Sequence, residues 1–203
     1  MALSRTTELD AVNIMLSNIG EAPVNSLTTN VTADVSMAKN ILNEVSREVQ
    51  SAGWHFNTDL EVPLIPDATS KEISITTNTV RVDLEGENEK SDIDLVIRGE
   101  KLYDRKNRTY LFDETLKGTV VYLMEFTDLP ETARRYIMIR SARIYQDRLL
   151  GSEKHHMFSL RDEQAAFMAL REYEMDTADY SIFDNYSVYR VIDRGDVVKR
   201  ITS

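Results

Sequence analysis

The spacing of apolar residues predicts two helices at the start of the chain. Residues 6–19 carry apolar side chains three and four positions apart, and Gly20 ends that pattern. A second helix is expected over residues 32–52, and Gly53 follows it where a left-handed residue commonly closes a helix. The apolar stripe of this second helix comprises Val35, Ala38, Leu42, Val45, Val49 and Ala52.

Between residues 56 and 126 the apolar period shortens toward two, which is typical of β-strands. This pattern predicts a small antiparallel sheet or open barrel of about five to seven strands. The expected strand segments are 60–64, 73–75, 80–84, 95–97, 101–104, 109–112 and 119–126. The expected turn residues between them are Gly86, Gly99, Asn107 and Gly118.

Helical spacing returns after Pro130, with Asp128 ahead of it as the expected N-cap. This third helix continues to Gly151, and a fourth is expected over residues 153–179. The expected packing side of the fourth helix carries Met157, Leu160, Gln164, Phe167, Met175 and Ala178.

The third and fourth helices differ in charge. Arginines lie on the third at Arg134, Arg135, Arg140, Arg143 and Arg148, and acids on the fourth at Glu153, Asp162, Glu163, Glu172, Glu174 and Asp176. Antiparallel packing would pair these charges within the chain. Alternatively, Arg134 and Arg135 contribute to an interface with another subunit or with a partner protein.

Together these elements predict an α+β fold, in which a four-helix bundle carries an inserted β domain and an extended C-terminal arm. Residues 1–55 and 128–180 form the two halves of the bundle, residues 56–127 the insertion, and residues 181–203 the arm. The apolar alternation of the arm suits strand addition to a neighbour's sheet edge, although it could instead fold back on its own sheet. The arm's candidate interface residues are Tyr186, Val188, Tyr189, Arg190 and Ile192.

The stretch GWHFNTDLEVPLIPD, residues 53–67, lies where the second helix ends and the strands begin. We expect Gly53 to turn the chain, and Trp54 and Phe56 to fill the seam between the helical and strand layers. His55 has no partner at ligand spacing, so we interpret it as structural. This stretch is therefore predicted to be a domain joint and not an active site.

The composition limits the possible chemistry. The 203-residue chain has a net charge of -10, which argues against sequence-specific nucleic-acid binding, and it contains no cysteine. No apolar run approaches the roughly 20 residues of a membrane span, and no signal peptide is evident, so we expect cytoplasmic synthesis and no membrane insertion.

The motif search predicts no catalytic, cofactor or metal site. Nucleotide-binding, hydrolase and zinc-protease motifs do not occur, and His155 and His156 are adjacent, so they cannot share a metal on one helix face. The segment ENEKSDID, residues 87–94, lacks the glycine of a calcium loop. The many carboxylates leave open one enzyme alternative, a cell-envelope glycan hydrolase with paired carboxylates.

Several stretches resemble the tail tubular protein A family, the adaptor or gatekeeper proteins of short-tailed podoviral phages. They are LDAVNIMLSNIGEAPVNSL (9–27), ILNEVSREVQSAGWHFNTD (41–59), LIPD (64–67), YDR (103–105), LPETARRYIMIRSARIYQDRLLG (129–151) and EYEMDTADYSIFD (172–184). These blocks follow one another in order along nearly the whole chain.

The resemblance implies a virion tail component that assembles in the host cytoplasm. It implies a dodecameric ring between the portal protein and the tail nozzle protein, tail tubular protein B, with double-stranded DNA leaving through the bore. The family's work is structural and needs no catalytic residues, and an acidic bore would let DNA slide. A competing hypothesis is a helical regulator that binds an anionic partner through the basic helix at residues 134–148.

Overall fold

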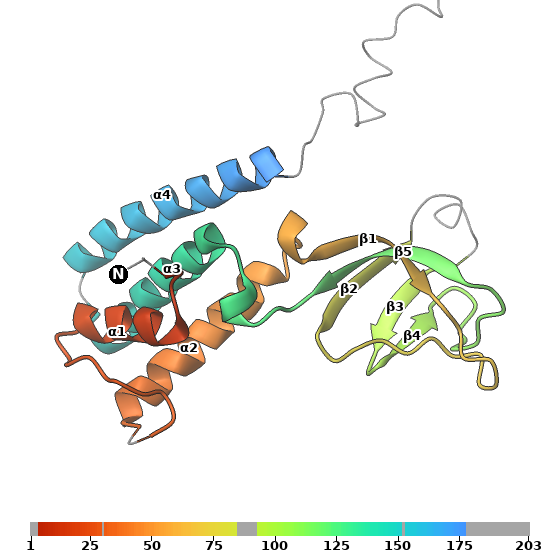
Figure 1. Ribbon diagram of the computed structural model, residues 1–203, viewed down its shortest axis with the longest axis horizontal. Coiled ribbons are helices and arrows are strands. Elements are labelled where there is room, and N and C mark those ends of the chain that lie inside the picture. The colour runs from red at the N-terminus through yellow and green to blue at the C-terminus, as the bar shows by residue number, and fades with distance from the viewer. Residues whose placement is uncertain (1–3, 30, 85–92, 152, 178–203) are drawn as a thin grey trace, which may run out of the picture.

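The computed structural model describes residues 4–29, 31–84, 93–151 and 153–177. The helices gather at one end of an elongated molecule and the strands at the other (Figure 1). Small antiparallel sheets are inserted between the second and third helices of this described chain, which confirms the predicted α+β class. The predicted arm, residues 181–203, lies outside the described residues.

The first helix, α1 (Glu8–Asn18), lies within the predicted range 6–19 and is shorter because Thr7 is its N-cap and Ile19 its C-cap. The hydroxyl of Thr7 accepts a hydrogen bond from the Asp10 amide at 3.2 Å, and the Asp10 carboxylate accepts one from the Thr7 amide at 3.0 Å. This reciprocal pair satisfies two backbone donors of the first turn. Gly20 adopts a left-handed φ of 83° just beyond the helix.

The second helix, α2 (Ala33–Gln50), is capped by Thr32 and is followed by Gly53 with a φ of 77°. Its predicted stripe is buried as far as Val49. Ala52 is exposed because the helix has already ended, so its place in the stripe was wrong.

In the described residues, five strands form two antiparallel sheets and no closed barrel. The short 3₁₀ helix η1 (His55–Asn57) precedes them. The central strand β5 (Leu116–Tyr122) pairs with both β1 (Thr58–Leu64) and β2 (Thr79–Leu84). The second sheet is a hairpin of β3 (Leu95–Arg98) and β4 (Lys101–Asp104).

Two predicted strands, 73–75 and 109–112, do not form. The chain near them makes isolated bridges, one between Glu72 and Leu111 and one between Ser74 and Lys101. Their side chains still contribute to packing, since Ile73 and Phe112 are buried in the strand core. The apolar alternation therefore correctly indicated which side chains are buried. The backbone there is too irregular to form continuous β-strand hydrogen bonding.

Gly118 was predicted to lie at a turn, and this prediction was wrong. It lies inside the central strand β5, opposite Val62 of β1 and Leu84 of β2. A Cβ atom at this position would lie 2.6 Å from the carbonyl oxygen of Asp83. Glycine is required here by the close approach of the neighbouring backbone and not by a bend.

The third helix, α3 (Glu131–Leu149), follows Pro130, which occupies the N-cap position. Asp128 is not the cap, because it belongs to a separate 3₁₀ helix, η3 (Phe126–Asp128). The fourth helix, α4 (Glu153–Thr177), runs alongside α3 (Figure 1). None of the described helices has the length and apolar character of a membrane span.

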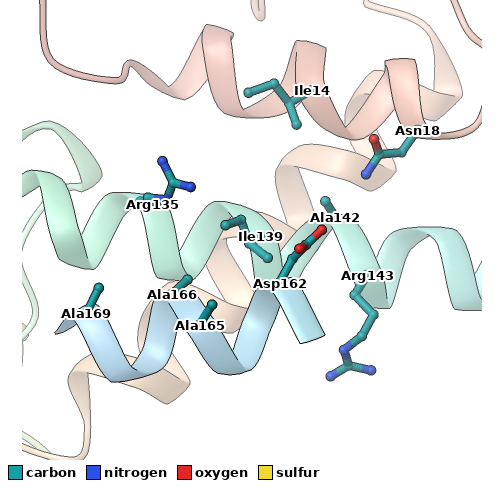
Figure 2. Close-up of a pocket in the computed structure, with 10 residues that line it drawn as sticks. All are labelled: Ile14, Asn18, Arg135, Ile139, Ala142, Arg143, Asp162, Ala165, Ala166 and Ala169. Carbon is teal, nitrogen blue, oxygen red and sulfur yellow. The ribbon is translucent and has the colours of Figure 1, made fainter. Parts of the chain in front are cut away.

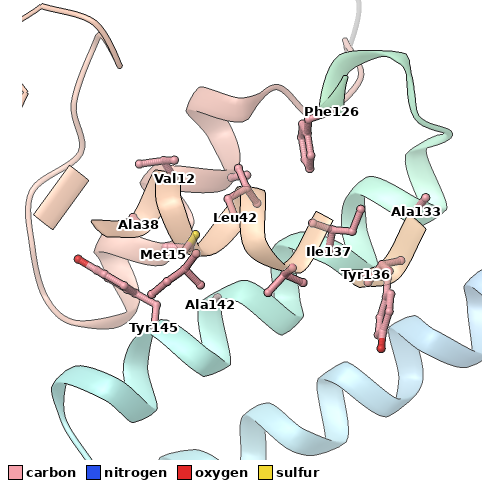
Figure 3. Close-up of a cluster of buried hydrophobic side chains, with 14 of the residues drawn as sticks. Val12, Met15, Ala38, Leu42, Phe126, Ala133, Tyr136, Ile137, Ala142 and Tyr145 are labelled. Atoms are coloured by element: carbon pink, nitrogen blue, oxygen red, sulfur yellow. The ribbon is translucent and has the colours of Figure 1, made fainter. Parts of the chain in front are cut away.

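The molecule has two separate hydrophobic cores. The helical core joins α1, α2, α3 and α4, and Figure 3 shows Met15 of α1 and Leu42 of α2 beside Ile137 and Tyr145 of α3 within it. The strand core is formed around Leu102, Phe112 and Val120. Each core lies at its own end of the molecule, so the segments that connect them determine how the two ends are held.

The predicted packing side of α4 was also wrong. Among the side chains of this helix that the structure describes, Glu163, Ala166 and Leu170 are buried, whereas Leu160 and Met175 are 37% and 67% exposed. Of the predicted stripe, Phe167 does pack on the helical core. The side chain of Met157 and all of Ala178 lie outside the described residues. The misassignment arose because α4 carries a second apolar stripe that does not face the core.

Candidate functional sites: the joint, the charged seam and a groove between helices

The connection between the two cores is built on the buried side-chain amide of Gln50, the last residue of α2. Its Oε1 accepts a hydrogen bond from the Met124 amide at 2.7 Å, and its Nε2 donates to the Met124 carbonyl at 3.0 Å. Nε2 also donates to the Ser46 hydroxyl at 2.9 Å. The end of α2 is thereby tied to the chain that leaves the central strand.

Asn57 makes the second tie of the joint. Its Nδ2 donates to the carbonyl oxygens of Gln50 at 3.0 Å and Tyr122 at 2.7 Å. Its Oδ1 accepts a hydrogen bond from the Trp54 amide at 2.8 Å. Both buried amides use all their hydrogen-bonding atoms, which is the condition under which buried polar groups stabilise one geometry.

The predicted joint residues surround these amides. A Cβ atom on Gly53 would lie 2.7 Å from Nη2 of Arg81 and 3.2 Å from Cγ2 of Val121, so the end of α2 approaches the sheet closely. The Trp54 indole donates to the Val49 carbonyl at 2.7 Å.

The two aromatic rings of the joint lie on the helical side. Trp54 stacks on Phe56 with ring centroids 6.3 Å apart and meets Phe167 of α4 edge-on at 6.4 Å. Both rings pack on the helical core, which is one of the two layers that they were expected to join.

Sequence reasoning missed Gln50 and Asn57. Their signal was two amide residues seven positions apart, on either side of the glycine that ends an apolar helix. Amide side chains in such a position can satisfy backbone groups that the end of a helix leaves unpaired. The bonds reach Tyr122 and Met124, however, and the sequence alone did not indicate which strand passes the end of α2.

His55 of the joint is exposed, and its backbone amide donates to a carboxylate oxygen of Glu174. Within the described residues, no group of three or more histidine, cysteine, aspartate or glutamate side chains could hold a metal ion. Four described carboxyl groups have displaced pKa values, namely Asp10, Glu44, Asp67 and Asp104, and all four are lowered. None of these four resembles the general acid of a glycosidase, which needs a raised pKa.

Arg134 does not present its charge at the surface, contrary to the prediction that it belongs to an interface. Its side chain is buried, with Nε donating to the Leu129 carbonyl at 2.8 Å and Nη1 to the Thr6 carbonyl at 2.8 Å. Nη2 donates to the Thr127 carbonyl. Arg134 therefore fastens the N-terminal segment and η3 to α3, while its neighbour Arg135 is exposed.

The predicted charge pairing between α3 and α4 is present and centres on the buried carboxylate of Glu163. Glu163 accepts hydrogen bonds from Arg143 and, at 3.1 Å, from Arg140. Arg140 also contacts Glu48 of α2 at 2.6 Å, and Arg148 contacts Glu44 of α2 at 3.1 Å.

Most arginine side chains of the basic helix α3 therefore form contacts within the chain. The hydrogen bond to Glu163 raises the pKa of Arg143, which remains charged. Arg134 is buried, and Arg140, Arg143 and Arg148 have acidic partners, so Arg135 is left for an outside contact. This distribution weighs against the hypothesis that the helix binds a polyanion.

A groove of about 660 Å³ opens between α1, α3 and α4. Its apolar surface is formed by Ile14 of α1, Ile139 of α3 and the alanine side chains of α4 (Figure 2). Polar residues at its edge are Asn18, Arg135, Arg143 and Asp162. The helices therefore form an open bundle, in which α4 leans on α3 and leaves an apolar hollow beside α1.

The structure brings together the predicted joint residues Gly53, Trp54 and Phe56, and it places Arg135 on the groove. The candidate arm residues Tyr186, Val188, Tyr189, Arg190 and Ile192 lie outside the described residues. Their assignment to an interface remains a prediction.

Two comparisons with known proteins agree with this architecture. The family model described as tail tubular protein matches residues 9–180. The chain belongs to the tail tubular protein family. A related protein, tail tubular protein A of Klebsiella phage KP34, is 29% identical over 167 residues, which cover 82% of this chain and 86% of the relative. Membership makes the protein a structural component of a podophage virion tail, and it confirms the resemblance seen in the sequence.

Proposed function

We propose that the protein is the adaptor that joins the portal to the tail nozzle protein, tail tubular protein B, as a dodecameric ring around the DNA ejection channel. The observation that carries this proposal is the match to the tail tubular protein family along residues 9–180, which includes the helices, the strands and the joint together. The relative from phage KP34 is likewise similar along most of both chains.

The elongated architecture supports an adaptor role. An adaptor contacts one neighbour at each end and must keep a fixed geometry between the two contacts. The helical and strand cores lie at opposite ends of the molecule (Figure 1). The fully hydrogen-bonded amides of Gln50 and Asn57 hold the connection between those ends.

The charge of the protein suits a channel that DNA passes through. A net charge of -10 on each subunit gives a ring that repels phosphates, so the duplex slides without sequence-specific binding. This work is structural and needs no catalysis or cofactor. The subunits assemble in the host cytoplasm before they join the virion.

Deletion of the gene from its phage, with the protein supplied from a plasmid as the control, tests this function. We expect DNA-filled heads that lack tails, and restoration of complete particles by the plasmid. Complete tailed particles in the absence of the protein would contradict an adaptor role. Digestion of purified cell-envelope glycan by the protein would instead favour the hydrolase alternative.

A further inference from the structure

One helix, α4, carries two solvent-facing surfaces of different shape. Towards the groove it presents Ala165 and Ala169, whose small side chains leave the hollow beside Ile14, itself 40% exposed. On another side it presents a ridge of Leu160, Met168 and Met175, which are 37%, 59% and 67% exposed. At 100° per residue, the centres of the ridge and the alanine stripe lie roughly 110° apart around the helix axis.

We propose that the Leu160–Met168–Met175 ridge of one subunit packs into the α1–α3–α4 groove of the next subunit. The inference rests on the proposed ring, because a ring of identical subunits requires a heterologous contact, in which two different faces of the same chain meet. The occupant of the groove is therefore a second copy of this chain. Methionine suits the role because its flexible side chain fills irregular apolar hollows.

Ring symmetry determines the direction in which the neighbouring helix enters. Successive subunits of a twelvefold ring differ by a rotation of about 30°. Such a small rotation keeps the neighbour's α4 nearly parallel to the α4 that lines the groove. The C-terminal end of the ridge therefore meets the Ala169 end of the groove, and the Leu160 end meets Asp162.

The charges at the two ends agree with this parallel arrangement. Arg135 lies beside the Ala169 end of the groove (Figure 2) and forms no ion pair within the described residues. Glu172 and Asp176, both exposed, lie beside Met175 at the matching end of the helix, on the side of α4 that runs from the ridge to the alanine stripe. At the other end the exposed Arg161 beside the ridge would meet Asp162 of the groove. An antiparallel arrangement would bring Arg161 to Arg135, with like charges opposed.

Cysteine cross-linking of the full-length protein tests the contact directly, because the chain contains no cysteine of its own. The paired variant Ile14→Cys with Met168→Cys places one thiol in the groove, on α1, and one on the ridge of α4. The control pair, Leu60→Cys with Met168→Cys, joins the ridge to an exposed position on β1. Rings formed with the portal are treated with a short bismaleimide and separated under denaturing conditions.

The proposal predicts a ladder of covalent oligomers for the groove–ridge pair and none for the control pair. Equal mixtures of the two single-cysteine variants should give dimers, whereas each single variant alone gives monomers. If rings form and neither pair cross-links, the groove contact is wrong while the adaptor function stands. If the wild-type protein forms no ring with its portal, the contact and the proposed function both fall.

A charge exchange gives an independent readout. Arg135→Glu alone, or Glu172→Arg with Asp176→Arg, should each lower ring yield roughly tenfold at fixed protein concentration. Combining all three changes should recover most of the yield, since the opposite charges again face each other. Undiminished yield in the separate variants, with unchanged monomer melting, would overturn the proposed pairing.

Discussion

The side-chain amide of Gln50 and the backbone of Met124 form a reciprocal pair of hydrogen bonds, 3.0 Å and 2.7 Å long, across a sequence separation of 74 residues. The pair joins the point where the chain leaves the helices to the point where it returns to them. Together with the hydrogen bonds of Asn57, this pair holds the end of α2 against the chain that follows β5. The proposed adaptor function requires such a fixed relation between the two ends.

Substitution of Gln50 by alanine should lower the free energy of unfolding by about 2 to 4 kcal/mol, because it leaves the partly buried amide and carbonyl of Met124 without these partners. Gln164→Ala is the matched control, since Gln164 is an exposed glutamine on a helix. Chemical denaturation followed by Trp54 fluorescence measures both. Equal stabilities for the two variants would show that the reciprocal pair contributes nothing.

Trp54→Ala should destabilise the protein by about 2 to 4 kcal/mol, near the lower end of the range for aromatic residues because the ring is partly exposed. The loss combines the contacts with Phe56 and Phe167 and the hydrogen bond to the Val49 carbonyl. The wild-type fluorescence should show emission between that of buried and fully exposed tryptophan. Emission typical of full exposure would contradict the packing described here.

Arg134 and Arg135 are adjacent but should respond differently to substitution by glutamate. Arg134→Glu should destabilise the monomer by about 3 kcal/mol or more, because it removes three backbone contacts and buries a carboxylate among carbonyl oxygens. Arg135→Glu should leave monomer melting within about 0.5 kcal/mol of wild type and reduce assembly instead. Thermal melting and light scattering on the same samples separate the effects, and similar melting of the two variants would refute the distinction.

Asp104 should make the β3–β4 hairpin sensitive to acid. Burial raises the pKa of Asp104, but hydrogen bonds from the Asn107 side chain and from the amides of Asn107, Asp94 and Lys106 outweigh it, so the net pKa is lowered. A lowered folded pKa gives stability above the unfolded value of about 3.9, and this stability is lost as pH falls through the folded pKa.

The Asp104→Asn variant should therefore be less stable than wild type at neutral pH, and the difference should shrink below about pH 4. The exposed Asp113→Asn change is the control. Denaturation curves at several pH values provide the measurement. A difference between Asp104→Asn and wild type that stays constant down to the lowest pH would refute the role of the ionised carboxylate.

Local sequence signals were sufficient where short-range chemistry determines the structure. The left-handed Gly53 and the α2 stripe as far as Val49 were predicted from neighbouring residues. Gly118 was wrongly predicted to lie at a turn. Glycine is required there by the backbone of another strand, which lies 2.6 Å from where a Cβ atom would be. The reciprocal bonds of Gln50 were missed for the same reason, since nothing near Gln50 in sequence specifies Met124.

The candidate site was predictable to a smaller extent. The excess of arginines on α3 and of acids on α4 correctly indicated charge pairing between these two helices, which occurs through Glu163. The sequence could not show that Arg134 is buried while Arg135 is exposed, because the carbonyl oxygens that Arg134 contacts belong to Thr6, Thr127 and Leu129, outside its own helix. It also could not separate the two apolar stripes of α4, since both have helical spacing.

Deletion of residues 185–203 tests the predicted arm. We expect the truncated protein to keep its melting temperature and to lose ring assembly or portal binding, because the arm's apolar alternation suits strand addition to a neighbour. Scanning calorimetry and co-sedimentation with the portal measure the two properties. A lower melting temperature with intact association would assign the arm to its own domain.

Negative-stain electron microscopy of the full-length protein mixed with its portal tests the adaptor function most directly. The account predicts a closed ring of this protein, coaxial with the portal and attached to one of its faces, with a central bore wide enough for duplex DNA. Monomers that leave the portal bare, together with salt-sensitive binding of duplex DNA by the isolated protein, would contradict the adaptor and favour a helical regulator instead.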